Sequence, residues 1–199
     1  MKHCLNTNTI EMKRYHIRAA CLFLLTVSYN SNTQNKTATI KNVRPTTQVS
    51  PEEKIARQIF QSFKNNDEKL WEALYPDNNE YNELLQLMLK EKMAGLTQEK
   101  IDGMMKQRTM EATTVYTAEF NHLRKQADSA GIKWNKAVYS KFDYQSAAPA
   151  SFSGKYLNGD LWCMYGKKEF VIEGIEAVET FTGFRLQSIK AIRKIEDSY

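Results

Sequence analysis

A change of hydrophobic period at Gly131 constrains the fold of this 199-residue chain more than any other feature. Before Gly131, apolar residues recur every three or four positions, as they do along one face of a helix. After it, apolar and polar residues alternate, as they do in a strand with one buried face. Because helical and extended segments are grouped rather than interleaved, the sequence predicts an α+β domain.

Three to four helices are expected in the first half of the domain. Ser50-Pro51-Glu52-Glu53 predicts a helix start, since Ser caps the helix and Pro suits its first turn. That helix should end at Asn65-Asn66-Asp67. Gly103 and Thr113-Thr114 weaken the last helical region, which we expect to form either two helices or one bent one. The helices after the first are expected around Trp71 (ended by Pro76), over Glu80–Ala94 and over Thr97–Ala130.

Four antiparallel strands are expected to follow, forming one curved sheet against which the helices pack. In the first strand, the alternation places Val138, Ser140, Phe142 and Tyr144 toward the core and the residues between them toward solvent. Gln145 to Ser151 is expected to be a loop. The four predicted strands are Val138–Tyr144, Lys155–Tyr165, Glu169–Val178 and Phe184–Ile195.

Gly166-Lys167 fits a two-residue hairpin turn with Gly at the first position. This turn predicts the pairing of the second and third strands, in which Tyr165 faces Lys168, Cys163 faces Phe170 and Leu161 faces Ile172. The face that carries Leu161, Cys163, Phe170 and Ile172 is then the core face. Gly174 breaks the alternation and predicts a bulge that bends the sheet.

The N-terminal residues resemble an export signal. Basic residues between Lys13 and Arg18 precede an apolar run of about nine residues, which is shorter than the roughly 20 that a membrane span needs. We therefore expect residues 1–28 to be a signal peptide cleaved after Ser28, with the natural start at Met12. Residues 29–49 are polar and aperiodic, so they predict a flexible linker before a single domain at 50–199. This organisation predicts a secreted or periplasmic protein without a membrane span after cleavage.

Removal of residues 1–28 also changes the charge of the protein. The segment holds four Lys or Arg and one Glu, so the net charge falls from +5 to +2. A nucleic-acid partner is therefore not expected. Cys163 is the one cysteine after the signal, so the domain should be held by its hydrophobic core rather than by an internal disulfide.

The order of these elements resembles the NTF2-like (cystatin-like) superfamily, many of whose members are small exported bacterial proteins. In the helical half, the similarity lies in the apolar residues at helical spacing from Ile55 to Phe63 and in Asp67-Glu68-Lys69-Leu70-Trp71. In the strand half, it lies in the tail from Asn158-Gly159-Asp160-Leu161-Trp162 through Gly166-Lys167-Lys168 to Ile195. The resemblance implies helices on a cone-shaped sheet with a pocket between them. Members of this superfamily use that pocket for catalysis, for ligand binding, or fill it with side chains.

Several catalytic chemistries have no motif in this chain. It lacks a glycine-rich phosphate loop, His-Glu-x-x-His, Cys-x-x-Cys and Gly-x-Ser-x-Gly. His122 is the one histidine after the signal, and we expect it to be a partly exposed helical residue rather than a catalytic base. Asp143 and Asp160 fall on the solvent face of the predicted sheet, which leaves an isomerase without a base. We expect no cofactor and no metal, and the sequence favours a non-enzymatic protein without deciding the question.

The leading hypothesis is an exported domain that binds a small apolar ligand or a protein partner in the helix–sheet pocket. Aromatic residues at the strand ends, with Tyr hydroxyls to orient a ligand, are typical of such a pocket. One alternative is an NTF2-like isomerase or lyase that uses a pocket carboxylate and a tyrosine, and another is a structural envelope protein. A homodimer is left open. The candidate ligand-binding residues are Phe142, Tyr144, Cys163, Tyr165 and Phe170.

Overall fold

The computed structural model describes residues 49–195 except 93–94 and 149–152. The predicted signal peptide, its cleavage site and nearly all of the predicted linker lie outside the described residues. The described residues form one compact unit. In chain order its described elements are α2 (Pro51–Asn65), α3 (Glu68–Glu72), α4 (Asn78–Lys90), α5 (Gln98–Ser129), the 3-10 helix η1 (Trp134–Lys136), β1 (Val138–Ala147), β2 (Tyr156–Tyr165), β3 (Lys168–Thr180), β4 (Gly183–Ser188) and β5 (Ala191–Lys194).

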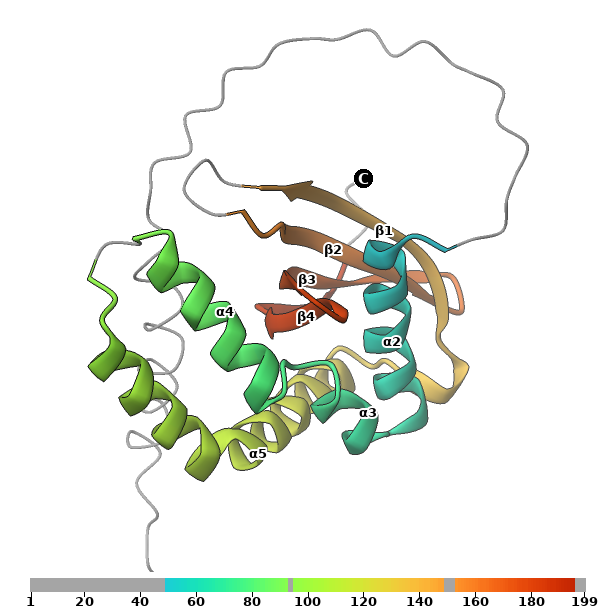
Figure 1. The fold of residues 1–199 in the computed structure, drawn as a ribbon. Coiled ribbons are helices and arrows are strands. Elements are labelled where there is room, and N and C mark those ends of the chain that lie inside the picture. Colours follow the sequence, from blue (N-terminus) through green and yellow to red (C-terminus); the bar gives the residue numbers. More distant parts are fainter. Residues whose placement is uncertain (1–48, 93–94, 149–152, 196–199) are drawn as a thin grey trace, which may run out of the picture. The chain divides into compact units, whose positions relative to one another are not determined.

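The α+β prediction is confirmed: helices precede a curved antiparallel sheet (Figure 1). The hydroxyl of Ser50 accepts a hydrogen bond from the Glu53 backbone N–H at 3.1 Å, which caps α2 as expected. Asn66 adopts a left-handed conformation that ends the same helix. The predicted stop after Ala130 is also confirmed, since the Ile132 N–H donates to Ala127 O at 3.0 Å and the Ile132 side chain is buried.

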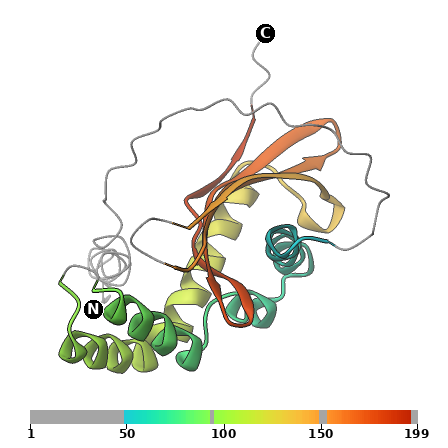
Figure 2. The ribbon, with the colours of Figure 1, turned by 45° about the horizontal axis from the view of Figure 1, so that its top comes forward.

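The long region after Thr97 forms one helix, α5, which bends near its middle (Figures 1 and 2). Its second half places Phe120, Leu123 and Ala127 in the main core. Its first half lies beside α4 and buries Ile101 outside that core. The two halves therefore pack against different partners, the first against α4 and the second against the main core.

Phe63 lies at the centre of the main core and is fully buried. Its ring stacks on Phe120 and Trp134, with ring centroids 5.3 Å and 5.0 Å away, and it contacts Trp71 at a tilt. These partners come from α5, η1 and α3, so one side chain of α2 holds four elements together. Truncation of a core aromatic of this kind costs about 3–5 kcal/mol. The remaining core comes from the sheet, including Leu161, Phe170, Ile172, Ile175 and Leu186.

The sheet order is β1-β2-β3-β4, with β5 also paired to β3. The predicted hairpin register is confirmed at all three positions, because Tyr165 pairs with Lys168, Cys163 with Phe170 and Leu161 with Ile172. The predicted bulge is confirmed as well: Glu173 and Gly174 together lie opposite Asp160. Gly174 has a φ of +64°, which favours glycine, and its N–H donates to the Asp160 carboxylate at 2.8 Å.

Three predictions about the strands are wrong. The expected strand Phe184–Ile195 is divided into β4 and β5, because the bend of β3 at Gly174 lets each pair with a different part of β3. In β1, Ser140 is an extra residue relative to β2, so the alternation reverses there and Tyr139 rather than Val138 faces the core. Val138 is 59% exposed. The strand also continues to Ala147, into the predicted loop.

Candidate functional site

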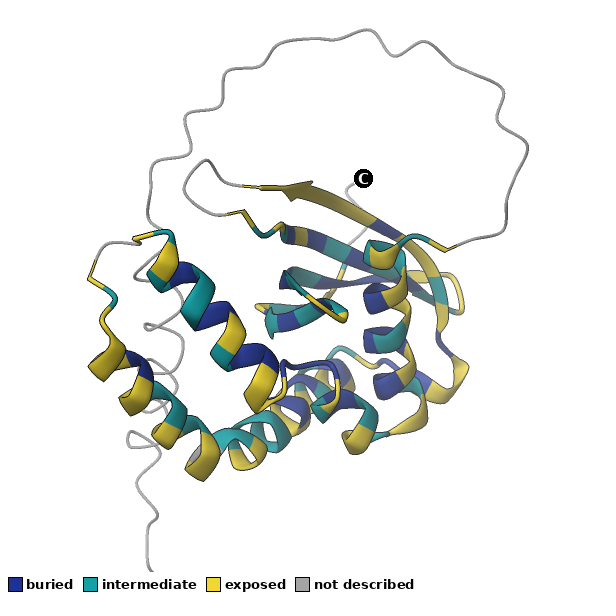
Figure 3. Cartoon of the chain, viewed as in Figure 1, coloured by how far each residue is buried: buried dark blue, intermediate teal, exposed yellow. Residues whose placement is uncertain are grey.

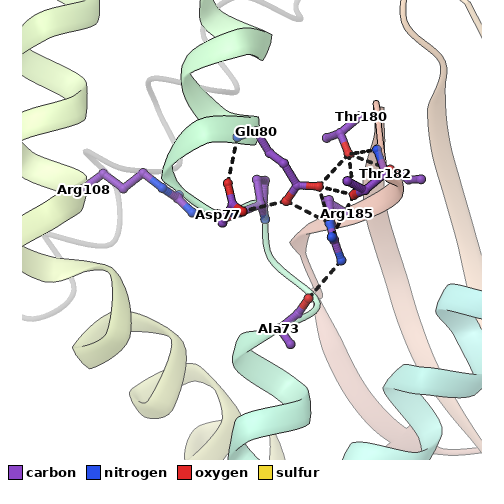
Figure 4. Close-up of polar contacts among 9 residues, drawn as sticks. Ala73, Asp77, Glu80, Arg108, Thr180, Thr182 and Arg185 are labelled. Atoms are coloured by element: carbon purple, nitrogen blue, oxygen red, sulfur yellow. Dashed lines mark hydrogen bonds and ion pairs between the residues drawn. The ribbon is translucent and has the colours of Figure 1, made fainter.

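Glu80 is a buried carboxylate at the start of α4, and polar groups surround it (Figure 4). Arg185 Nε lies 2.8 Å from Glu80 Oε1 and 3.0 Å from Oε2. The hydroxyls of Thr180 and Thr182 both donate to Oε1, the first at 3.0 Å. The Asp77 N–H donates to Oε2 at 2.9 Å, which closes a capping box with the Asp77 side chain.

These contacts fix the charge state of Glu80. Burial alone would raise the pKa of this carboxyl group, because it disfavours the ionised form. The hydrogen bonds from Thr182, the Asp77 backbone, Arg185 and Thr180 outweigh burial and hold the pKa below its ordinary value of 4.5. An ionised carboxylate with both oxygens occupied is a poor general base. Glu80 instead joins α4 to the β3–β4 hairpin.

Arg108 of α5 is the centre of a second polar and aromatic group. Its guanidinium lies 4.4 Å from the ring centroid of Tyr81, donates to the hydroxyl of Tyr116 at 2.6 Å, and donates to the Pro76 carbonyl. The Tyr116 ring stacks on Tyr75 at 3.8 Å. This group fastens α5, next to its bend, to the loop that precedes α4. The contacts of Arg108 therefore hold helices together and do not form a binding site.

The predicted site residues Cys163 and Phe170 are fully buried and belong to the main core. The expectation that Cys163 is a core thiol is confirmed. Burial, with a smaller contribution from the charge of Glu169, raises the pKa of Cys163 to about 12. Because neither side chain is exposed, neither Cys163 nor Phe170 can contact a ligand in this structure.

Phe142 and Tyr144 of β1 form a stacked pair, with ring centroids 5.1 Å apart and an interplanar angle of 22°. Phe142 is 8% exposed, whereas Tyr144 is 41% exposed. Gly159 lies opposite Tyr144 in β2, and a Cβ there would come within 2.8 Å of the Phe142 ring and of Tyr144 Cβ. Both side chains therefore pack directly over a position that has no room for a side chain.

Tyr165, the remaining predicted site residue, lies far from Tyr144 along the sheet. It is six residues beyond Gly159 along β2, which corresponds to roughly 20 Å of strand. Its side chain is partly buried and packs against the core. The structure therefore brings Phe142 and Tyr144 together and separates Tyr165 from them.

The two aspartates considered for the isomerase alternative lie away from the core face. The Asp143 carboxylate pairs with Lys141 at 2.6 Å and is 55% exposed. Asp160 is engaged with the bulge through the Gly174 N–H. His122 is exposed, and its Nε2 lies 3.0 Å from the side-chain amide nitrogen of Gln126. In the part of the chain that is described, no three His, Cys, Asp or Glu residues are grouped so as to hold a metal ion.

Two polar features of the structure do not follow from the predicted helix and strand patterns. The helical pattern predicts Glu80 only as the first residue of a helix, although Asp77-x-x-Glu80 is a capping-box pattern that marks a helix start. The alternation predicts Tyr139 on the solvent face, whereas its side chain packs against the core. Burial raises the pKa of Tyr139, and the neighbouring Glu53 carboxylate adds to that rise, while Arg57 lies 4.5 Å from the ring centroid. Only the bulge at Ser140 could have revealed this, and no Gly or Pro marks it.

Comparison of the chain with protein-family models, with curated proteins and with solved structures found no match. Among the described residues, no helix combines the length and the apolar character that crossing a membrane requires.

Proposed function

We propose that this protein is an exported, non-catalytic domain with an NTF2-like layout that binds a small apolar ligand at the Phe142–Tyr144 pair. The single observation that carries the proposal is the half-exposed ring of Tyr144, which is stacked on Phe142 at 5.1 Å. Of the five residues that the sequence nominated, Tyr144 has the large exposed aromatic surface.

The packing around Gly159 supports binding by a preformed surface. The Phe142 ring is buried directly over the Gly159 backbone, so it has little freedom to move and gives the Tyr144 ring a fixed surface on which to stack. A rigid aromatic surface loses little conformational entropy when a ligand stacks on it. The Tyr144 hydroxyl adds one polar group that can orient the ligand.

The contacts of Asp143, Asp160 and Glu80 favour binding over catalysis. The Asp143 carboxylate lies on the opposite face of β1 from Tyr144 and is paired with Lys141. The carboxylates of Glu80 and Asp160 are engaged in the contacts described above. Export is supported by the basic and apolar pattern of residues 13–27, which resembles a signal peptide.

The test uses the dye 1-anilinonaphthalene-8-sulfonate, whose fluorescence rises when it binds apolar surface. Wild-type protein should give a saturable increase, and Tyr144→Ala should weaken dye binding at least tenfold. Phe181→Ala is the matched control, because Phe181 is a 66% exposed aromatic on the β3–β4 turn and should leave the affinity unchanged. Equal affinities for all three proteins would disprove a site at Tyr144. Native mass spectrometry of protein from its own host would then identify a retained ligand by its mass.

A further inference from the structure

The two edges of the sheet differ in whether their outward-facing backbone N–H groups have hydrogen-bond acceptors. On the β4/β5 edge, the Leu186 N–H donates to the Leu74 carbonyl at 2.7 Å. The Ile192 N–H on the same edge donates to Gln126 Oε1 of α5 at 3.0 Å. The turn after α3 and the helix α5 thus supply acceptors for this edge, which protects it from pairing with another strand.

The β1 edge has no such cover. Among the described residues, β1 pairs with β2 on one side, and no backbone hydrogen bond joins Lys141–Ala147 to any element other than β2. Of these seven residues only Phe142 is buried (Figure 3). Their register with β2 is unbroken from Lys141 to Ala147, so this stretch is regular strand. Contacts from α2 reach instead the start of the strand, where Lys64 Nζ donates to Ala137 O.

Charge does not protect this edge either. Natural edge strands are often guarded by a lysine that repels a second strand. Here the Lys141 ammonium pairs with Asp143 of the same strand at 2.6 Å and lies 4.9 Å from the Trp162 ring centroid. The stretch Lys141–Ala147 holds one positive and one negative charge, so it presents no net charge to an approaching strand.

We propose that two copies of this chain pair through β1 in antiparallel fashion, with Tyr144 opposite Tyr144 of the second copy. Pairing centred on Lys141 or Asp143 would place like charges directly opposite, which is destabilising. Pairing centred on Phe142 would run into the bulge at Ser140. Centring on Tyr144 matches all seven regular residues with their counterparts and places Asp143 opposite Gln145.

The same register gives the two tyrosines a favourable contact. Directly opposite residues of an antiparallel pair have Cβ atoms about 4.5–5.5 Å apart, and aromatic pairs at that spacing stabilise the sheet. The two Phe142–Tyr144 pairs would then form one continuous aromatic surface on the helix-covered face. The contact surface is small, so the dimer dissociates at micromolar rather than nanomolar concentrations.

Sedimentation velocity of the full chain from about 1 µM to about 300 µM tests the dimer. Wild type should shift from monomer to dimer across this range. Asp143→Lys gathers four ammonium groups at the interface and should raise the dissociation constant at least tenfold. Glu83→Lys is the matched control, since it makes the same charge change at an exposed position of α4 and should behave as wild type. A monomer at every concentration, or equal weakening by both variants, would overturn the proposal.

Disulfide trapping tests the register, in a background where Cys4 and Cys21 are replaced by Ser. Tyr144→Cys should form a covalent dimer under oxidised glutathione, because residue 144 faces itself across the interface. Ser140→Cys is exposed on the same strand but lies in the bulge, outside the paired stretch, and should remain monomeric. Equally fast linking of both variants would overturn the Tyr144-centred register. Neither measurement involves the dye, so the dimer and the ligand site are tested separately.

Discussion

Arg185 Nε lies 2.8 Å from Oε1 of Glu80, whose side chain is only 1% exposed, whereas the carboxylates of the other ion pairs in the described part of the chain are at least 25% exposed. The pair joins the first turn of α4 to β4. Its stability does not come from attraction alone, because a buried charge must first be removed from water. The hydroxyls of Thr180 and Thr182 and the Asp77 N–H supply the hydrogen bonds that compensate this loss.

Glu80→Gln should destabilise the domain by about 2–4 kcal/mol. The amide keeps the shape of the side chain but leaves Arg185 without a counter-charge and turns one acceptor into a donor that faces donors. Urea unfolding followed by circular dichroism measures the change. Glu83→Gln, an exposed position on the same helix, should change the unfolding free energy by less than about 0.5 kcal/mol. A loss of similar size in both variants would show that the buried pair has no special role.

Acid should weaken the domain through the same residue. The pKa of Glu80 is lower in the folded protein than its ordinary value of 4.5. Its contribution to stability is therefore fully present above pH 4.5 and is lost as the pH falls below that value, through the folded-state pKa. The free energy of unfolding, measured from pH 7 down to about pH 3, should fall more steeply in wild type than in Glu80→Gln. The pKa of Glu173 is also lowered by Arg193, so some acid sensitivity should remain in the variant. Identical pH profiles would contradict this assignment.

Gly159→Ala should destabilise the sheet by about 1–3 kcal/mol through overpacking. The new Cβ would lie 2.7 Å from the Asp143 carbonyl oxygen, which is backbone and cannot move aside cheaply. Gly103→Ala is the paired comparison, because no heavy atom lies within 4 Å of a Cβ built there. As a substitution inside a helix, it should stabilise the domain by about 0.5–1 kcal/mol. Thermal unfolding of the two variants should therefore shift in opposite directions.

Cys163 should be unreactive while the domain is folded. The thiol is fully buried, and burial raises its pKa to about 12, so almost no thiolate is present near neutral pH. With Cys4 and Cys21 replaced by Ser, Ellman's reagent should label the native protein only at the rate of unfolding and should label it at once in strong denaturant. Rapid stoichiometric labelling of the native protein would place Cys163 at an accessible surface.

The parts of the fold that were predictable are those fixed by short-range chemistry. Ser50-Pro51 and Asn65-Asn66-Asp67 bound α2 because caps and turns depend on neighbouring residues. The register of the β2–β3 hairpin was predictable because a two-residue turn leaves one alignment of Cys163 with Phe170.

The parts that were not predictable depend on distant partners. The break between β4 and β5 follows from the bend of β3, while Phe184–Ile195 itself shows no interruption as strong as a Gly or a Pro. The burial of Glu80 follows from groups that lie about a hundred positions later, at Thr180 and Arg185. For the candidate site, the aromatic residues of the strands could be identified from the sequence. Only the pairing of β1 with β2 shows that Phe142 and Tyr144 lie together and that Tyr165 lies apart from them.

The separation of 105 positions between Glu80 and its arginine has a consequence for synthesis. A nascent chain that ends before Thr180 already contains every helix that the structure describes, yet the first turn of α4 has neither its cation nor the two threonine donors. Ordering α4 against the sheet must therefore wait until the ribosome has delivered the last hairpin, because closure of so long a loop comes before the contacts that reward it. Until then, α2, α3 and α5 already have their shared contacts around Phe63, whereas the first turn of α4 has none of its partners on the hairpin.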